Sequence, residues 1–395
     1  MASEENVIFG KSEGEWSGLK GIHTAVEIAQ QPTTWEKTYL QIHGELEAVK
    51  GFVSKTFESQ DFDVVLTGAG TSEFVGNSVF PYLSEQHDYK VHSYGTTDIV
   101  EAPHRYLSPE KQTLLVSYGR SGDSPESVGA VQAADMVCSN LQHLFITCNR
   151  DGALSQAAAK RENAMAINLD PATLDQSFAM TSSYTNMALA TLLSLQTQDI
   201  DAYREVIEAM AGAARRIVSE DWKVLRQLVD EFDFKTIVYL GANCLKGTAQ
   251  ESRLKMLELT QGAVTTAFDS PMGFRHGPKS VVDEHTLVVV YLSDDPAMRR
   301  YDRDLILEIS RQRKGDRLMV VGNHCKEEYA PLCDYCFDLE LPMSLDNAYL
   351  GLCYVMYAQI IALFKSVFVG IWPDDPCPSG EVNRVVQGVT IYPVE

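Results

Sequence analysis

The sequence predicts an α/β protein with two tandem domains, each a doubly wound parallel sheet, together with flanking helices and an irregular C-terminal tail. Three observations predict this fold. The chain has 395 residues, which exceeds what one hydrophobic core usually fills. Apolar, β-branched runs alternate with segments long enough for helices. The pattern of runs in the first half of the chain recurs in the second half.

Eight apolar runs are expected to be strands. They lie at 62–70, 112–120, 143–151 and 164–170, and then at 235–243, 285–293, 317–325 and 335–341. A near-continuous apolar run is typical of a strand buried on both faces. Helix-length segments such as SPESVGAVQAADMV and ALSQAAAKRE separate the runs. This alternation predicts parallel sheets with right-handed crossovers, whose ligands bind beyond the carboxyl ends of the strands.

The repeat has a nearly constant spacing. Three equivalent pairs are separated by 173 or 174 residues: Gly68 with Gly241, Leu114 with Leu287, and Leu144 with Leu318. Solenoid repeats have far shorter periods. The spacing therefore predicts a duplicated domain.

The flanking segments complete the predicted organisation. Residues 15–60 have helical character with a break at Gln31-Pro32, and 200–230 has helical periodicity. The last stretch is rich in Pro and Gly and cannot form a regular helix. The predicted boundaries are an N-terminal helical segment 1–45, a first domain 46–200, a linker helix 201–230, a second domain 231–365, and a tail 366–395 that packs over the site.

Composition excludes several classes of protein. A hydrophobic fraction of 45% excludes wholesale disorder, and 33 Lys and Arg against 54 Asp and Glu give a net charge of −21. Such an acidic surface repels nucleic acid and anionic membranes. We find no apolar stretch of the roughly 18 residues that span a bilayer, and the acidic N-terminus does not resemble a signal peptide. A cytoplasmic location is expected.

The eight cysteines are expected to be thiols. Four of them lie in apolar runs, where a small buried side chain is the usual role: Cys138, Cys148, Cys244 and Cys353. A second group contains a CxxC and offers a zinc site as an alternative: His324, Cys325, Cys333 and Cys336. Its spacing is irregular and no second CxxC exists, which favours ordinary thiols near a strand end.

A phosphate cradle is predicted in the first half. The run LLVSY leads into GRSGDSPES, where Ser124 suits the N-cap of a helix and Pro125 its first position. Glycines allow backbone N–H groups to converge at a helix N-terminus, and Ser121 and Ser124 add hydroxyls. The neighbouring loop GAGTS supplies Thr71 and Ser72. The alternative is a pair of tight turns with capping serines.

The corresponding loop of the second half does not suit a phosphate. It reads YLSDDP, and the carboxylates of Asp294 and Asp295 would repel an anion. The duplication therefore predicts one phosphate site per chain, on the first half.

The second half carries candidate proton carriers instead. The helix after GAN contains Glu251, Lys255 and Glu258, and the last two share a face because they are three residues apart. The turn GFRHGP places His276 on a rigid loop. A carboxylate can move a carbon-bound proton and a histidine an oxygen-bound one. The alternative is a surface ion pair and a solvated loop histidine.

These motifs together resemble tandem SIS (sugar isomerase) domains over nearly the whole chain. GAGTS and GRSGDSPES resemble the two sugar-phosphate loops of that family. The segment EIAQQP resembles the start of the isomerase portion of glucosamine-6-phosphate synthase, and RLKMLELT resembles its catalytic helix. The resemblance implies that Glu258 is the enolisation base, with Lys255 beside it.

Two further motifs carry the resemblance. FRHGP resembles the ring-opening loop of the synthase, which a neighbouring subunit contributes there. This implies a ring-opening role for His276 and a homodimer or homotetramer with a shared site. LDQSFAMTSSYTNM resembles a further substrate loop, which implies that Thr181 and Ser182 lie near the sugar.

Two departures from the synthase indicate the subclass. The chain as given has no glutaminase domain, and the position of the Schiff-base lysine in the synthase tail corresponds to Gln387. Both differences suit a degradative enzyme, and the resemblance is greatest to AgaS-type proteins. It implies a galactosamine-6-phosphate deaminase/isomerase, formerly called a tagatose-6-phosphate ketose/aldose isomerase, in which Arg120 adds charge to the cradle. No metal or redox cofactor is required.

Three alternatives remain open from the sequence. They are an aldose–ketose isomerase of unaminated sugar phosphates, a glucosamine-6-phosphate deaminase, and a non-catalytic regulator that binds sugar phosphate. A regulator needs the cradle but not Glu258 and His276, so their presence argues against it.

Overall fold

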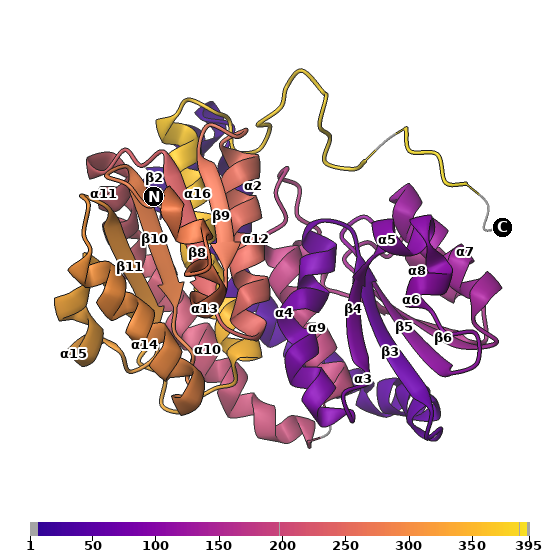
Figure 1. Cartoon of the computed structure of the whole chain (residues 1–395). Coiled ribbons are helices and arrows are strands. Elements are labelled where there is room, and N and C mark those ends of the chain that lie inside the picture. Colours follow the sequence, from indigo (N-terminus) through magenta and orange to yellow (C-terminus); the bar gives the residue numbers. More distant parts are fainter. Residues whose placement is uncertain (1–6, 197, 387, 393–395) are drawn as a thin grey trace, which may run out of the picture. The chain divides into compact units, whose positions relative to one another are not determined.

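The computed structural model describes residues 7–392 except 197 and 387, and it divides into two compact units (Figure 1). The second-half unit contains the chain up to Pro32, Gln176–Thr181 and Glu208–Ser379. The first-half unit contains Thr33–Asp175, Ser182–Ile207 and the chain from Gly380 onward. Each unit therefore combines segments that are not contiguous in sequence.

The first-half unit is built on a five-stranded parallel sheet of order β4-β3-β5-β6-β7. The strands are β3 (Phe62–Gly68), β4 (Val91–Gly95), β5 (Gln112–Gly119), β6 (Asn140–Thr147) and β7 (Ala164–Asn168). The helices are α4 (Thr71–Gln86), α5 (Thr96–Glu101), α6 (Pro103–Tyr106), α7 (Pro125–Val137), α8 (Ala153–Ala158) and α9 (Ser182–Leu195), with a 3₁₀ turn at Pro171–Thr173. Buried Val65, Leu115, Ile99 and Ala130 form a core in which α5 and α7 cover one face of the sheet.

The second-half unit has a five-stranded parallel sheet of order β12-β11-β10-β8-β9. The strands are β8 (Thr236–Gly241), β9 (Thr265–Asp269), β10 (Thr286–Tyr291), β11 (Arg317–Gly322) and β12 (Tyr335–Asp338). The helices are α12 (Cys244–Leu259), α13 (Pro271–Phe274), α14 (Pro296–Arg311), α15 (Lys326–Tyr329) and α16 (Asn347–Phe368), with 3₁₀ turns at Pro278–Val281 and Ala330–Leu332.

The two sheets confirm the predicted duplication. Their strand orders coincide when β3 is matched with β8 and β5 with β10. In the first sheet Val64 pairs with Leu114, and in the second Ile237 pairs with Leu287, so both partners move by 173 residues. The strand order reverses between β3 and β5 in the first sheet and between β8 and β10 in the second. Ligands of doubly wound folds bind at such a switch point. The predicted fold class is therefore correct.

All eight predicted strands exist, but two further strands of the five-stranded sheets escaped prediction. These are β4 and β9, each at the edge of its sheet. Most of their residues are only partly buried, and VHSYG and TTAFD are correspondingly not apolar runs. The opposite edge strands, β7 and β12, are also only partly buried but lie in apolar runs, so a pattern based on apolar runs detects them and misses β4 and β9.

The remaining elements lie before the first sheet and between the two sheets in sequence. The N-terminal part contains a short hairpin (β1, Val7–Ile8; β2, Lys11–Ser12) and helices α1 (Glu13–Gly18), α2 (Ile22–Ala29) and α3 (Gln31–Phe57), with the predicted break before α3. The predicted linker is helical: a 3₁₀ turn at Ile200–Tyr203, α10 (Arg204–Arg216), a π-helical turn at Ile217–Asp221, and α11 (Trp222–Glu231). The tail after α16 has no regular element over its described residues.

Helix α16 corrects the expectation that no segment reaches membrane-spanning length. It has 22 residues, its most apolar window has a mean hydropathy of 1.6, and 94% of that window is buried within the protein. It is the one helix in the described residues that meets this test. Because α16 packs against α2, α11 and α12, its apolar surface serves the core of the second-half unit.

The cysteines are free thiols, and Cys138, Cys148, Cys244 and Cys353 are buried as predicted. In the second group, the Cys325 Sγ lies 3.9 Å from the Cys336 Sγ, and the Cys333 thiol donates to the Tyr329 carbonyl. No group of three or more His, Cys, Asp or Glu that suits a metal ion occurs in the described part of the chain.

Candidate functional site

The predicted phosphate cradle lies at the carboxyl ends of two paired strands. Strand β3 leads through Gly70 into Thr71 and Ser72, the first residues of α4, and β5 leads through Ser121 to α7. Thr71 and Ser72 are buried, whereas Ser121 and Ser124 are half-buried. Two helices of 16 and 13 residues thus begin side by side at this edge. A helix N-terminus carries partial positive charge and N–H groups that point along the helix axis, the usual basis of anion binding.

Glycines shape the loop after β5. Gly122 has a φ of +70°, which favours glycine. A Cβ on Gly119 would lie 2.9 Å from the Gly122 Cα, and one on Gly152 would lie 2.2 Å from the Ser121 carbonyl oxygen. The Asn149 side chain donates to that same carbonyl at 2.9 Å. The loop is therefore compact and holds Ser121 from both sides.

Ser124 has the capping role that the sequence predicts. Its side chain accepts a hydrogen bond from the Ser127 backbone N–H at 3.3 Å, and the two hydroxyls are 2.7 Å apart. Ser124 is thus a capping serine, as the alternative interpretation expected. Capping is compatible with donation to a phosphate, because a hydroxyl can accept one hydrogen bond and donate another.

Arg120 connects the cradle with the C-terminal tail. Its guanidinium is buried and donates to the Arg384 carbonyl at 2.7 Å. Arg384 in turn donates to the Asp175 carbonyl. The Asp175 carboxylate accepts hydrogen bonds from Ser182 and from the Ser183 backbone at 2.8 Å. The cradle, the tail and the start of α9 therefore share one hydrogen-bonded network.

The equivalent loop of the second-half unit is closed by its own side chains. Asp294 accepts from the Asn323 amide at 2.9 Å and from the Leu345 N–H at 3.2 Å, and Arg299 lies 3.5 Å from it. Asp295 caps α14. The carboxylates hold the donors that a phosphate would need.

Three charged side chains of α12 form a compact group. The Lys255 Nζ lies 3.1 Å from Glu251 Oε1 and 2.8 Å from Glu258 Oε2. Glu251 and Lys255 are fully buried, while the side chain of Glu258 is 25% exposed. Burial alone would lower the pKa of Lys255, but the two carboxylates outweigh it and raise that pKa above its ordinary value. Lys255 therefore stays charged and Glu258 presents a carboxylate toward solvent.

His276 lies on the loop that follows α13. Its backbone N–H donates to the Gly273 carbonyl at 2.9 Å, and Gly277 has a φ of +121°. The residue is exposed. Within the described residues of the second-half unit, no ion pair or hydrogen bond joins its side chain to the α12 group. The structure thus confirms the loop, and leaves the predicted role to be tested.

The remaining predicted residues have mixed placements. Thr181 and Ser182 are buried, and the Ser182 hydroxyl donates to Asp175. Gln387 lies outside the described residues. Within the first-half unit the structure brings the cradle residues together, and within the second-half unit it brings Glu251, Lys255 and Glu258 together.

Sequence reasoning passed over three network residues although its motifs contained them. Glu27 of EIAQQP is buried and accepts hydrogen bonds from the Gln176 and Ser177 backbone within the second-half unit. Asp175 belongs to LDQSFAMTSS, and Arg384 lies three residues before Gln387. A carboxylate inside an otherwise apolar or hydroxyl-rich motif is a signal for such anchoring, because a buried charge needs partners.

Comparison with known proteins shows which fold class this chain shares. No protein-family model matches the chain. The C-terminal domain of glucosamine-fructose-6-phosphate aminotransferase from Francisella tularensis shares the fold, with a TM-score of 0.74 at 18% identity over 89% of this chain and 98% of that one. The tandem SIS-type α/β architecture is therefore established.

Nearer relatives narrow this class. D-galactosamine-6-phosphate deaminase AgaS from Shewanella sp. (strain ANA-3) is 41% identical over 374 residues, or 94% of this chain and 92% of the relative. The solved tagatose-6-phosphate ketose/aldose isomerase from Escherichia coli has a TM-score of 0.84 at 36% identity, covering 94% of this chain and 97% of that one. The chain belongs to the AgaS family of SIS-domain proteins.

Proposed function

We propose that the protein is a cytoplasmic deaminase/isomerase that converts galactosamine 6-phosphate to tagatose 6-phosphate and ammonia in amino-sugar catabolism. The observation that carries the proposal is the division of chemistry between the halves. One half has a hydroxyl-rich loop at two helix N-termini, and the equivalent sites of the other half have a closed acidic loop and a buried Glu–Lys–Glu group. Kinship with deaminases of the AgaS family supports the choice of substrate.

The cradle binds the phosphate of the sugar. Ser72, Ser121 and Ser124 donate through their hydroxyls, Thr71 and the first turns of α4 and α7 contribute N–H groups, and Arg120 adds positive charge. Thr181 and Ser182 contact the sugar. These interactions exist equally in ground and transition states, so they set affinity and position rather than the rate of proton transfer.

Glu258 carries out the isomerisation. After His276 opens the pyranose ring, Glu258 removes the C2 proton of the aldose amine while O1 gains a proton, which yields an enolamine. The protonated Glu258 then returns the proton to C1. The product is a ketose imine, and water hydrolyses its C2–nitrogen bond to a ketone and ammonia.

Lys255 stabilises the negative charge that develops during enolisation. It also holds Glu258 in place, because the same ammonium bridges Glu251 and Glu258 on successive turns of α12. A carboxylate with a partly exposed side chain and a fixed cation beside it is suited to meet substrate from the solvent side.

The exposed position of His276 supports a shared active site in a homodimer or homotetramer, in which the loop serves a neighbouring subunit. Glu258→Gln chains and His276→Asn chains should each be inactive. Mixed after reversible dissociation, they should recover up to about a quarter of wild-type activity, since half of random dimers are mixed and each has one intact site. Full activity of a monomer would contradict shared sites.

Gln387 orients water or a sugar hydroxyl, because its side-chain amide can donate and accept hydrogen bonds but cannot form an imine. Borohydride treatment with tagatose 6-phosphate should leave the protein mass unchanged. A reduced adduct on Lys255 would instead indicate a Schiff-base mechanism.

Ammonia release tests the function directly. Incubation with galactosamine 6-phosphate should release ammonia in a one-to-one ratio with tagatose 6-phosphate, and glucosamine 6-phosphate should react more slowly. Ammonia from glucosamine 6-phosphate at a higher kcat/KM would reverse the substrate assignment.

A second candidate is an aldose–ketose isomerase of unaminated sugar phosphates, which the Escherichia coli relative of that name favours. It would use the same Glu258 and His276. Interconversion of galactose 6-phosphate and tagatose 6-phosphate, without ammonia from either amino sugar, would establish this candidate in place of the deaminase.

A further inference from the structure

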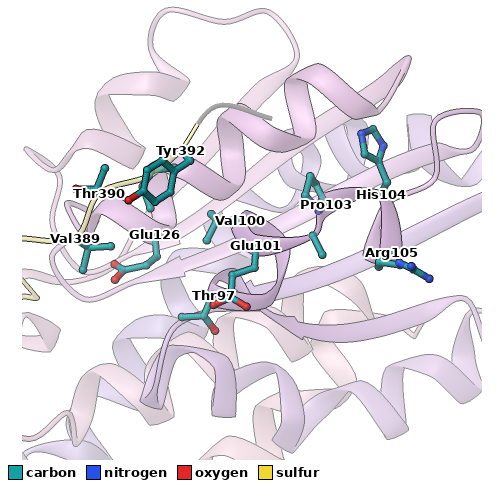
Figure 2. Close-up of a pocket in the computed structure, with 12 residues that line it drawn as sticks. Thr97, Val100, Glu101, Pro103, His104, Arg105, Glu126, Val389, Thr390 and Tyr392 are labelled. Atoms are coloured by element: carbon teal, nitrogen blue, oxygen red, sulfur yellow. The ribbon is translucent and has the colours of Figure 1, made fainter. Parts of the chain in front are cut away.

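A second cavity lies in the first-half unit between α5, the start of α7 and the tail. Its volume is about 780 Å³. Figure 2 shows Thr97 and Glu101 of α5 and Glu126 of α7 around it, with Thr390 and Tyr392 of the tail above. None of the residues assigned to catalysis or to the phosphate cradle lines this cavity.

Glu126 is the unusual feature of the cavity. The residue is 8% exposed, and its Oε2 is buried without a hydrogen-bond partner among the described residues. A buried carboxylate normally has a cation or several donors, because burying an unpaired charge strongly destabilises the folded state. The first turn of α7 favours a negative charge here but does not supply a partner.

The cations of the cavity do not neutralise Glu126. His104 and Arg105 lie at the other end of the view in Figure 2, both are exposed, and neither forms an ion pair with Glu126 in the described part of the chain. The other carboxylate, Glu101, is exposed. The buried part of the cavity at Glu126 is therefore negatively charged, whereas the exposed part carries the acidic Glu101 together with His104 and the basic Arg105.

The tail forms an apolar roof. Ile391 packs so closely on α7 that a Cβ at Gly129 would lie 2.9 Å from its Cγ2, and the same Cβ would lie 3.1 Å from Val100. Val389, Ile391 and Tyr392 thereby cover the cavity, together with Val100 and Pro103. An organic body fits these walls better than a bare metal ion, which would need several oxygen ligands.

We propose that this cavity binds a small organic cation with a primary ammonium group, and that Glu126 is its counter-ion. An ammonium group brings three donors, so it can satisfy the Glu126 carboxylate and the Thr97 or Thr390 hydroxyl together. The neighbouring Tyr392 ring offers a face for the ligand body. The cavity is thus a second ligand site on the first-half unit, separate from the phosphate cradle.

Calorimetric titration of the full chain with galactosamine, which lacks a phosphate, tests the proposal. Galactosamine should bind, and galactose, its neutral counterpart, should bind at least about tenfold more weakly. Glu126→Gln should weaken galactosamine binding by a similar factor, and Glu101→Gln should weaken it less because that carboxylate is exposed. Circular dichroism and thermal melting establish that each variant is folded, and Glu126→Asp replaces Glu126→Gln if the latter does not fold.

The Ser121→Ala variant separates the cavity from the cradle. Galactosamine binding should be unchanged in Ser121→Ala, whether or not the protein proves to be a deaminase. Binding that disappears in Ser121→Ala, that is undiminished in the Glu126 variant, or that is equal for galactose would overturn the proposal. The absence of any galactosamine binding to the wild-type chain would overturn it as well.

Discussion

The loops after β5 and β10 follow equivalent strands of the two sheets. Their side chains differ in whether they suit an anion. The first-half loop is rich in Gly and Ser and leads to a helix N-terminus capped by Ser124. In the second-half loop, the Asp294 carboxylate accepts hydrogen bonds from the Asn323 amide and the Leu345 N–H, so these donors are already occupied. The comparison teaches that a doubly wound topology provides a position for a ligand, while the loop side chains decide whether an anion can use it.

Helices α4 and α12 extend this comparison. Both have 16 residues and begin after a residue with almost the same unusual backbone angles: Gly70 at φ 56°, ψ −126° and Asn243 at φ 54°, ψ −127°. Subtracting 173 from Lys255 and Glu258 gives Tyr82 and Glu85 in α4. The duplicated helix thus keeps its geometry while its charged group differs, so Lys255 and Glu258 each have an equivalent position in α4 that can serve as a control.

The largest effect is expected for Glu258→Gln, which keeps the shape of the side chain but cannot accept a proton. We expect kcat to fall by about 10²–10⁴-fold with little change in substrate binding. Glu85→Gln, at the equivalent exposed position of α4, should leave kcat unchanged. Steady-state kinetics measure both variants. Equal activity of the two would show that Glu258 is not the catalytic base, and Glu251 would then be the next residue to test.

Lys255→Met should strongly destabilise the protein, because it removes the cation between two carboxylates. Lys255 is fully buried, and loss of one partner from a buried group costs about 3–5 kcal/mol. Tyr82→Phe in α4 removes one hydroxyl, 3.2 Å from the Tyr203 hydroxyl, and should cost about 0.5–1.5 kcal/mol. Urea unfolding measures both free energies, and equal costs would mean that the charged group is not stabilised by Lys255.

Ser121→Ala should raise KM while leaving kcat nearly unchanged. A hydrogen bond to a charged phosphate is worth about 1.5–3 kcal/mol, or roughly 10- to 100-fold in KM. Ser293→Ala in the second-half loop loses a hydrogen bond to Asn347 and should reduce stability without affecting KM. An unchanged KM with a lower kcat in Ser121→Ala would show that the first-half loop does not anchor the substrate.

The smallest effect concerns Asp302, which lies against the second-half loop and accepts from the Ser293 N–H at 3.0 Å. Burial raises its pKa from 3.8 to about 6. The folded state then holds a proton that the unfolded state releases between these values, so stability falls as pH rises through this window and stays reduced above it. Relative to Asp302→Asn, wild type should lose about 1–3 kcal/mol between roughly pH 4 and pH 7.5. A constant difference in melting temperature across this range would contradict the prediction.

Sequence reasoning predicted the central strands because their residues are buried on both faces, as in Leu114 and Leu287. It also predicted the edge strands β7 and β12, which lie in apolar runs, but it missed the edge strands β4 and β9, whose sequences VHSYG and TTAFD are not apolar runs. Helix α16 shows the converse error, since its hydropathy matches that of a membrane span and only the packing of α2, α11 and α12 around it reveals a core helix.

The duplication, the fold class and the residue types of the candidate site could all be predicted from the sequence, because they depend on local patterns that repeat at a spacing of 173 residues. Tertiary structure alone decided which polar groups find partners. Arg120 meets Arg384 across 264 residues and Thr24 meets Asp374 across 350, whereas Oε2 of Glu126 meets no donor among the described residues. Such partnerships depend on where distant segments come to rest, and hydrogen bonds act only over about 3 Å, so a local pattern carries no information about them.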